Sequence, residues 1–306
     1  METAADRLSK IRLLALTLTA LSLLVVLVSA VMRLDAAGLG CADWPICYGQ
    51  LLGREPQALQ FGAVRVLHRL GASASLLLGC VLVWSCWRPQ AVQPAATYAA
   101  ALLLLMLTLA TLGIWSADPR RVLVGFLNIM GGLGLVTFSW RVFLASGASR
   151  RVQSPARGVL LRIGVVGLSL TAMFGAWLGA SYSALACVSF PSCGGVWWPS
   201  SEGLSALNPF FRALAAPAAG DAGGQLLHLL HRYLALATLV VLGVAAVQLL
   251  RQGATRLVGR MLIGLLVVEV GLGVATVLSG LTLWLVVAPG GGAAVLLATV
   301  ATLLRR

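Results

Sequence analysis

Three histidines are present in the chain, and each stands in an apolar stretch. His68 lies in Val-Leu-His-Arg-Leu, and His228 and His231 lie in His-Leu-Leu-His-Arg-Tyr. Neutral imidazole is the usual axial ligand of heme iron inside a helix bundle. A membrane histidine can instead bond a backbone carbonyl or an interfacial water. Because the His-Arg pair recurs, metal or heme ligation by His68 and His231 is the favoured interpretation.

An arginine directly follows two of these histidines. The guanidinium groups of Arg69 and Arg232 match the geometry of a carboxylate, so they are candidates for binding heme propionates at the water interface. Their simpler role is to extend along the apolar surface and place the charge among lipid headgroups.

Two cysteine pairs share the pattern Cys-x-x-aromatic-Pro-x-Cys. They are Cys41 with Cys47 and Cys187 with Cys193. On the outward side of a membrane such thiols can form small disulfide loops, either as structural bridges or as redox groups exchanged by a thioredoxin-like partner. Two other cysteines, at positions 80 and 86, have no counterpart in the second half and are predicted to be buried apolar fillers.

Glu269 is the one acidic residue within a predicted membrane span, between Val268 and Val270. A carboxylate there is expected to face the bundle interior and to accept a hydrogen bond. A role in proton relay is the alternative.

The elements that carry these residues are apolar enough to lie in lipid. Hydrophobic residues make up 59% of the chain and charged residues 10%, with a mean hydropathy of +0.95. These values exclude an ordinary soluble domain. Apolar runs long enough to cross a bilayer occur at 11–32, 61–86, 96–116, 122–145, 158–180, 225–249, 258–280 and 282–304. The first run continues into a patterned loop, so we interpret it as a span rather than a cleaved signal.

The net charge of +13 is better explained by membrane topology than by nucleic-acid binding. With a cytoplasmic N-terminus, most arginines, including those of segment 146–157, fall on the cytoplasmic side, and most acidic residues fall outside. The sequence therefore predicts that both termini are cytoplasmic, with the lipid bilayer and not nucleic acid as partner.

The order of motifs is the same in both halves of the chain. Each half has a cysteine loop after its first span, then a polar loop, then a His-Arg helix. We expect an all-α integral membrane protein with eight transmembrane helices, arranged as two pseudo-symmetric four-helix bundles over residues 1–150 and 151–306. The largest loop, about 181–224, contains Trp197 and Trp198, which suit an interface belt. It could also form a lid.

These motifs resemble the heme A synthase family, whose members oxidise a methyl group of heme O to a formyl group. The resemblance rests on Gly-Leu-Gly-Cys-Ala-Asp-Trp-Pro-Ile-Cys-Tyr-Gly, on Ala-Leu-Ala-Cys-Val-Ser-Phe-Pro-Ser-Cys, and on the His-Arg helices, and it covers nearly the whole chain. It implies a heme O substrate site in the N-terminal half, with His68 on the substrate iron, and a heme b held by His231 in the C-terminal half. In the family each heme lies between histidines of the second and fourth helices of its half.

The chain departs from the family pattern at three positions. Asn128 and Pro289 stand where the fourth-helix histidines are expected, 60 residues after His68 and 58 after His231. Arg65 stands where the family usually has a glutamate implicated in the oxidation.

The departures leave each histidine without its expected partner across the porphyrin. His228 is one turn from His231 on the same helix face, so it is expected beside the heme or near a propionate rather than as the second axial ligand. A water molecule or the thioether of Met130 could be a weak substitute ligand in the N-terminal half.

The leading hypothesis is a divergent heme A synthase of the bacterial inner membrane that serves cytochrome oxidase assembly. Its expected partners are a heme O synthase, oxidase assembly factors and a second copy of the chain. One alternative is a non-catalytic paralogue that binds or transfers heme. Another is a periplasm-facing thiol-disulfide membrane protein that uses the cysteine pairs.

Overall fold

The computed structural model describes residues 3–38, 47, 62–116, 118–147, 158–208, 210, 213 and 215–304. Within this part of the chain, the long elements are eight α-helices, each long and apolar enough to cross a membrane, as predicted. They are α1 (Ala4–Ala36), α2 (Gly62–Trp87), α3 (Ala95–Leu112), α4 (Val122–Ala145), α5 (Gly158–Ala180), α6 (Ala222–Leu250), α7 (Arg256–Leu278) and α8 (Leu283–Leu303). Short 3-10 helices occur at η2 (Ser183–Ala186), η3 (Ser201–Leu207) and η4 (Gly253–Thr255).

Side chains form hydrogen bonds with unpaired backbone groups at the start of α6 and beside the proline inside α8. The Asp221 carboxylate caps α6 by accepting a hydrogen bond from the Gly224 N–H at 2.8 Å. Pro289 lies inside α8 and cannot donate to the carbonyl of Leu285, four residues earlier. The Thr276 hydroxyl of α7 lies within hydrogen-bond reach of that carbonyl and of the Leu272 carbonyl in its own helix, and its single proton can go to either. A neighbouring helix can thus supply the hydrogen bond that the proline lacks.

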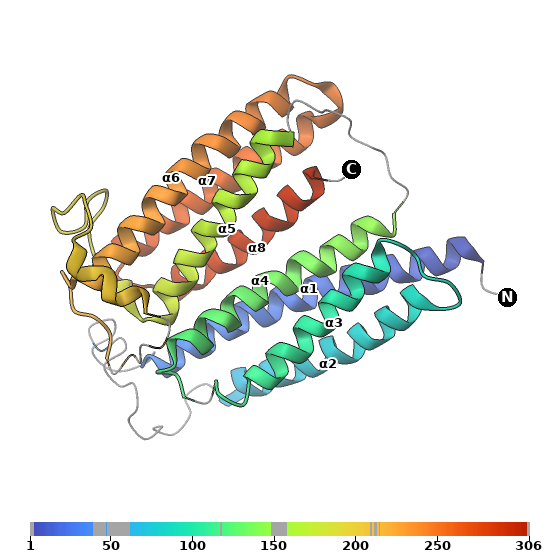
Figure 1. Cartoon of the computed structure of the whole chain (residues 1–306), viewed down its shortest axis with the longest axis horizontal. Helices are drawn as coiled ribbons and strands as arrows, with labels where there is room; N and C mark the ends of the chain where they lie inside the picture. The colour runs from blue at the N-terminus through green and yellow to red at the C-terminus, as the bar shows by residue number, and fades with distance from the viewer. Residues whose placement is uncertain are drawn as a thin grey trace.

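The helices pack in two groups of four, visible on opposite sides of the molecule in Figure 1. In the first group, α2 and α4 each pack against both α1 and α3, so α2 and α4 lie diagonally across the group. In the second, α6 packs against α5 and α7, and α8 packs against the same two helices. The groups meet where α4 packs on α5 and α8, and where α1 packs on α8. The pseudo-symmetry relating them stays a prediction.

Polar contacts join the two groups near the ends of α4 and α8. Arg141 donates to the Ala301 carbonyl at 3.1 Å and to the Tyr98 hydroxyl at 2.6 Å. The Trp140 indole donates to Thr302 at 2.8 Å. An arginine at this depth is tolerated because its donors reach a carbonyl and a hydroxyl inside the protein.

The two cysteines of α2 differ in burial. Cys86 is fully buried in the apolar cluster of the first group, as predicted. Cys80 is exposed on the surface of its helix, so the prediction that it is a buried filler is wrong. An exposed thiol on a membrane helix faces lipid, where a small apolar side chain is equally acceptable.

The segment between α5 and α6 covers one end of the molecule. Figure 1 shows it at one end of the molecule, whereas the start of α1 and the end of α8 both lie at the opposite end. An even number of spans has this consequence, because every pair of helices returns the chain to its starting side. Which side is cytoplasmic stays a prediction from the positive-inside rule.

Candidate functional site

A cavity of about 2140 Å³ runs through the interior and is lined by residues of both helix groups. Pockets for small ligands are commonly about 300–1,000 Å³, so this cavity has room for more than one such molecule. Ten residues singled out from the sequence line it: Arg65, His68, Arg69, Asn128, Trp197, His228, His231, Arg232, Glu269 and Pro289. The fold thus gathers residues that are far apart in the chain.

The imidazole of His231 has a defined orientation on α6. Its Nδ1 lies 3.0 Å from the carbonyl oxygen of Thr171 on α5. Because a carbonyl only accepts, Nδ1 carries the proton and Nε2 keeps its lone pair. Histidines that bind metal commonly donate their other ring N–H in this way. His231 is therefore prepared to act as a ligand through Nε2.

Gly175 allows the His231 ring to pack closely against α5. A Cβ atom at this position would lie 3.0 Å from Cε1 and 3.3 Å from Nδ1 of His231. Sequence reasoning missed both Gly175 and Thr171. A glycine within an apolar helix was the available signal, but many glycines of this chain are similarly placed.

His228 lies one turn before His231 and is only 6% exposed. Its Nε2 lies 3.0 Å from the carbonyl oxygen of Ser183 in η2, so Nε2 carries the proton. This bond holds η2 against the outer part of α6. His228 therefore uses its Nε2 in a structural contact, in keeping with the expectation that it is not the second axial ligand.

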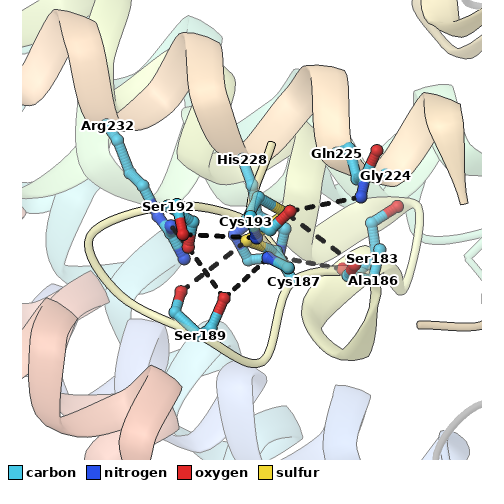
Figure 2. The surroundings of a disulfide bond; sticks show 12 residues. Ser183, Ala186, Cys187, Ser189, Ser192, Cys193, Gly224, Gln225, His228 and Arg232 are labelled. Carbon is cyan, nitrogen blue, oxygen red and sulfur yellow. Dashed lines mark hydrogen bonds between the residues drawn. A yellow bond between two sulfur atoms is a disulfide. The ribbon is translucent and has the colours of Figure 1, made fainter. Parts of the chain in front are cut away.

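Cys187 and Cys193 form a disulfide, as one alternative predicted, with Cα atoms 5.0 Å apart. The two residues are 2% and 0% exposed, which favours a structural bridge over thiol exchange. Figure 2 shows the loop that they close lying along α6, with the labelled Gln225, His228 and Arg232 beside it. The Gln225 side chain donates to the Cys193 carbonyl at 3.4 Å.

Arg232 fixes the same loop through its guanidinium. Its Nη1 donates to the carbonyls of Pro191 at 3.0 Å and Ser192 at 3.1 Å, and the group lies over the Phe190 ring. The Nη2 atom is buried without a hydrogen-bond partner in the described part of the chain. Phe190 and Pro191 line the cavity, so Arg232 fixes the part of the loop that covers it. The Nη2 group of Arg232 remains available to donate to a ligand.

The other predicted disulfide is described only at one residue. Cys47 takes part in a disulfide, and Cys41 lies outside the described residues.

In the segment between α5 and α6, Trp197 and Trp198 are 53% and 76% exposed, which suits an interface belt. Trp197 also lines the cavity, and its carbonyl accepts a hydrogen bond from Tyr233.

In the first helix group, His68 on α2 and Asn128 on α4 line the cavity from diagonally opposed helices. Neither side chain has a hydrogen-bond partner among the residues that the structure describes. Met130 does not line the cavity. It packs with Leu133 and Val136 toward the second group, so the expectation of a Met130 ligand is wrong.

Cations surround the outer part of the cavity near His68. The lining arginines there are Arg33, Arg65, Arg69, Arg120 and Arg121. Two acids accompany them: Asp35 pairs with Arg65 at 3.3 Å, and Asp118 pairs with Arg120 at 2.9 Å. Arginines outnumber the acids, so this region suits the carboxylates of an amphipathic ligand whose apolar body lies deeper.

Tyr182 closes the same region from the segment after α5. Its hydroxyl donates to the Pro119 carbonyl at 3.3 Å. Burial raises the pKa of Tyr182 to about 12, while the nearby Arg33 cation lowers it. The hydroxyl therefore keeps its proton at neutral pH and acts as a hydrogen-bond donor.

Glu269 faces the cavity from α7, as predicted. The expectation that it accepts a hydrogen bond is wrong, because Oε2 is buried without a partner in the described part of the chain. Its carboxylate lies against the backbone of α8 at Gly292, where any side chain would collide with it. The Glu269 carboxylate is thus part of the cavity wall and packs against the backbone of α8.

Comparison with known proteins places these features in a family. A family model described as cytochrome oxidase assembly protein, COX15-CtaA, matches residues 12–62 and 123–301, which is most of the chain. The chain belongs to this family. The family resemblance drawn from the cysteine loops and His-Arg helices is thereby confirmed.

Two heme A synthases are similar to this chain, over different shares of its length. A heme A synthase of Shewanella oneidensis is 29% identical over 315 residues, covering 95% of this chain and 94% of the relative. A heme A synthase of Bacillus pumilus is 24% identical over 200 residues, covering 60% of this chain and 63% of the relative. The family-model match leaves out residues 63–122, which contain His68, Arg65 and the whole of α3.

The cavity of this family member fits a porphyrin held by one histidine. His231 offers an oriented Nε2, Gly175 makes room for its ring, and Arg232 has an unpartnered donor at the outer side. The expected second histidine of this half is Pro289, which lines the cavity but has no ligating atom. The described residues of the C-terminal half therefore fit one axial imidazole and not two.

Proposed function

We propose that this protein is a heme A synthase that converts heme O to heme A by oxidising a ring methyl group to a formyl group. The product would serve assembly of a cytochrome oxidase in the bacterial inner membrane. Support comes from family membership, from a heme A synthase relative aligned over 95% of the chain, and from two His-Arg helices that line one cavity. The last of these observations carries the proposal, because His68 and His231 line the same space and that space is large enough for porphyrins.

The two halves divide the work in this proposal. The N-terminal half binds heme O as substrate, with His68 facing its iron, and the C-terminal half holds a resident heme b through His231. A bound heme b supplies one-electron redox chemistry. The arginines around the outer part of the cavity bind propionates, and Arg69 and Arg232 are the members nearest the histidines in sequence.

In this proposal, residues of the protein also limit access to the heme sites and exclude water from them. Phe190 and Pro191, held by the disulfide and by Arg232, cover the outer side of the C-terminal site. The apolar lining between the histidines and the inner ends of the helices keeps water from the ring. In the N-terminal half, Arg65 forms an ion pair with Asp35. A carboxylate thus lies beside the position where the family usually has a glutamate, but it comes from α1 and not from α2.

Co-expression with a heme O synthase tests the proposal. Noncovalent hemes are extracted from the purified protein and separated by chromatography, and we expect heme A or its hydroxylated precursor. The matched control is His68→Ala, which should abolish both products while the C-terminal heme b remains. Bound heme b without either product in the wild-type protein would contradict the enzymatic proposal.

A second candidate function is heme binding or transfer without catalysis. Asn128 and Pro289 favour it, since neither can replace a histidine as a strong axial ligand. It predicts stoichiometric heme b and no oxidised product in the same extraction. The third candidate, thiol-disulfide exchange without heme, is disfavoured for the C-terminal pair by the burial of Cys187 and Cys193.

A further inference from the structure

Glu269 is the only acidic residue of helices α5 to α8. It lies nine residues before the outer end of α7, and His231 lies nine residues after the outer start of α6. At about 1.5 Å per residue, both are roughly 13 Å from those ends. Both line the cavity, and α6 packs directly on α7. The carboxylate and the free imidazole nitrogen therefore stand at similar depth around the same space.

Among the described residues, none of the groups packed around Glu269 forms an ion pair with its carboxylate. On α6, the ionisable side chains that line the cavity are His228, His231, Arg232 and Tyr233. The Arg232 guanidinium is a cation whose Nη1 donates to the carbonyls of the disulfide loop, and it forms no ion pair with Glu269 in the described part of the chain. On α5 the charged residue is Arg162, on α7 itself they are Arg256 and Arg260, and α8 has none. No ion pair with Glu269 forms among the described residues.

An ionised carboxylate in such an apolar wall is stable only beside a cation, and otherwise it holds a proton. Oε2 has no partner in the described part of the chain that would satisfy the charged form. A heme b on His231 provides a charge that changes: the ferric porphyrin core carries one positive charge and the ferrous core none. With heme b bound there, the charge of the Glu269 carboxylate would depend on the electron on that heme.

We propose that Glu269 takes up one proton when the heme of the C-terminal half gains one electron, and releases it on reoxidation. The electron comes from a quinol-class reductant, or from dithionite in the experiment, and the proton comes from water. The net charge of the cavity is thus unchanged by reduction. This inference rests on the proposed function, because it requires heme b on His231.

Potentiometric titration of the purified protein with its bound heme b tests this inference. Between about pH 6 and pH 9, uptake of one proton per electron lowers the midpoint potential by about 59 mV per pH unit. Glu269→Gln removes the proton acceptor and should flatten the dependence, whereas Glu269→Asp should keep it. The control is Glu202→Gln, an exposed acid in η3 outside the cavity, which should match the wild type.

A second measurement does not depend on the variants retaining heme. The reduced-minus-oxidised infrared spectrum of the wild-type protein should show a carboxylic-acid C=O band appearing on reduction. Where Glu269→Gln still binds heme, that band should be lost.

The outcomes separate this inference from the proposed function. A wild-type potential that does not vary with pH, or an equal slope in Glu269→Gln, overturns the role of Glu269 while the heme site stands. Lack of bound heme in the wild-type protein overturns both.

Discussion

His231 illustrates how individual residues of this chain prepare a ligand site. Its Nδ1 donates to the Thr171 carbonyl, and Gly175 leaves space for the ring. The pairing fixes both the tautomer and the direction of the imidazole before any ligand binds, which reduces the cost of binding. His68 has no such support among the described residues, so the two halves differ in how firmly they present their histidine.

Gly175→Leu is predicted to displace the His231 ring, because even a Cβ atom at this position would lie 3.0 Å from Cε1. Loss of the oriented imidazole should weaken binding of heme b by roughly 10–100-fold. The measurement is heme content of the purified protein, determined as the pyridine hemochrome. Gly243→Leu is the control, since a Cβ atom there meets nothing within 4 Å. Equal heme content in the two variants would contradict the role of Gly175.

At the scale of elements, α8 places a proline where a ligand is expected. The helix stays intact, and the Thr276 hydroxyl of α7 is positioned to donate to the carbonyl that Pro289 leaves unpaired. Pro289 nevertheless lines the cavity. A ligating side chain at this position would therefore face the same space as His231.

Pro289→His is predicted to add a second axial ligand to the bound heme b. A heme with one imidazole is expected to be high-spin, and a second imidazole should convert its optical and electron paramagnetic resonance spectra to the low-spin form. Pro289→Ala is the matched control, because it restores the helix N–H without an imidazole and should leave the spectrum high-spin. Low-spin bands already present in the wild type would show that another group fills the position.

The disulfide loop is the second element whose role can be measured. Replacing both Cys187 and Cys193 by serine should lower the free energy of unfolding by about 2 kcal/mol, since the bridge closes a short loop. The expected readout is a lower Tm in detergent with the heme spectrum retained. Cys80→Ser, which changes an exposed free thiol, should leave the Tm unchanged. If the double variant keeps its Tm but loses heme oxidation, a redox role is supported instead.

At the scale of the whole molecule, the eight helices form two groups of four around one continuous cavity. The α1 start and the α8 end lie at the same end, and the segment that covers the cavity lies at the other (Figure 1). A ligand that extends carboxylates toward the arginines and an apolar ring inward matches this polarity.

The orientation of the whole molecule in the membrane is a separate prediction. The excess of arginine on the side of the termini predicts that this side is cytoplasmic. A fluorescent protein that matures only in the cytoplasm, fused after Arg306, should therefore be bright. The same reporter inserted in the exposed turn at Gly194 and Gly195 should be dark, and the reverse pattern would contradict the topology.

The amino-acid sequence by itself determined the eight spans, the family and the residues that gather at the cavity. This was possible because burial in lipid requires long apolar runs, and because the cysteine and histidine motifs recur in the same order in both halves of the chain. It did not reveal the carbonyl of Thr171, the opening at Gly175 or the ion pair of Arg65 with Asp35. Those contacts join different helices, and many glycines, threonines and acids in the chain were equally plausible candidates.

Other features depended on which face each helix turns toward its neighbours. Met130 was expected at the cavity and packs toward the second helix group instead, and Cys80 faces outward rather than into the core. In membrane helices that are apolar on all sides, the sequence pattern gives little indication of the buried face. The tertiary structure alone decided these orientations, because helix rotation follows from packing between small residues and polar contacts across the groups.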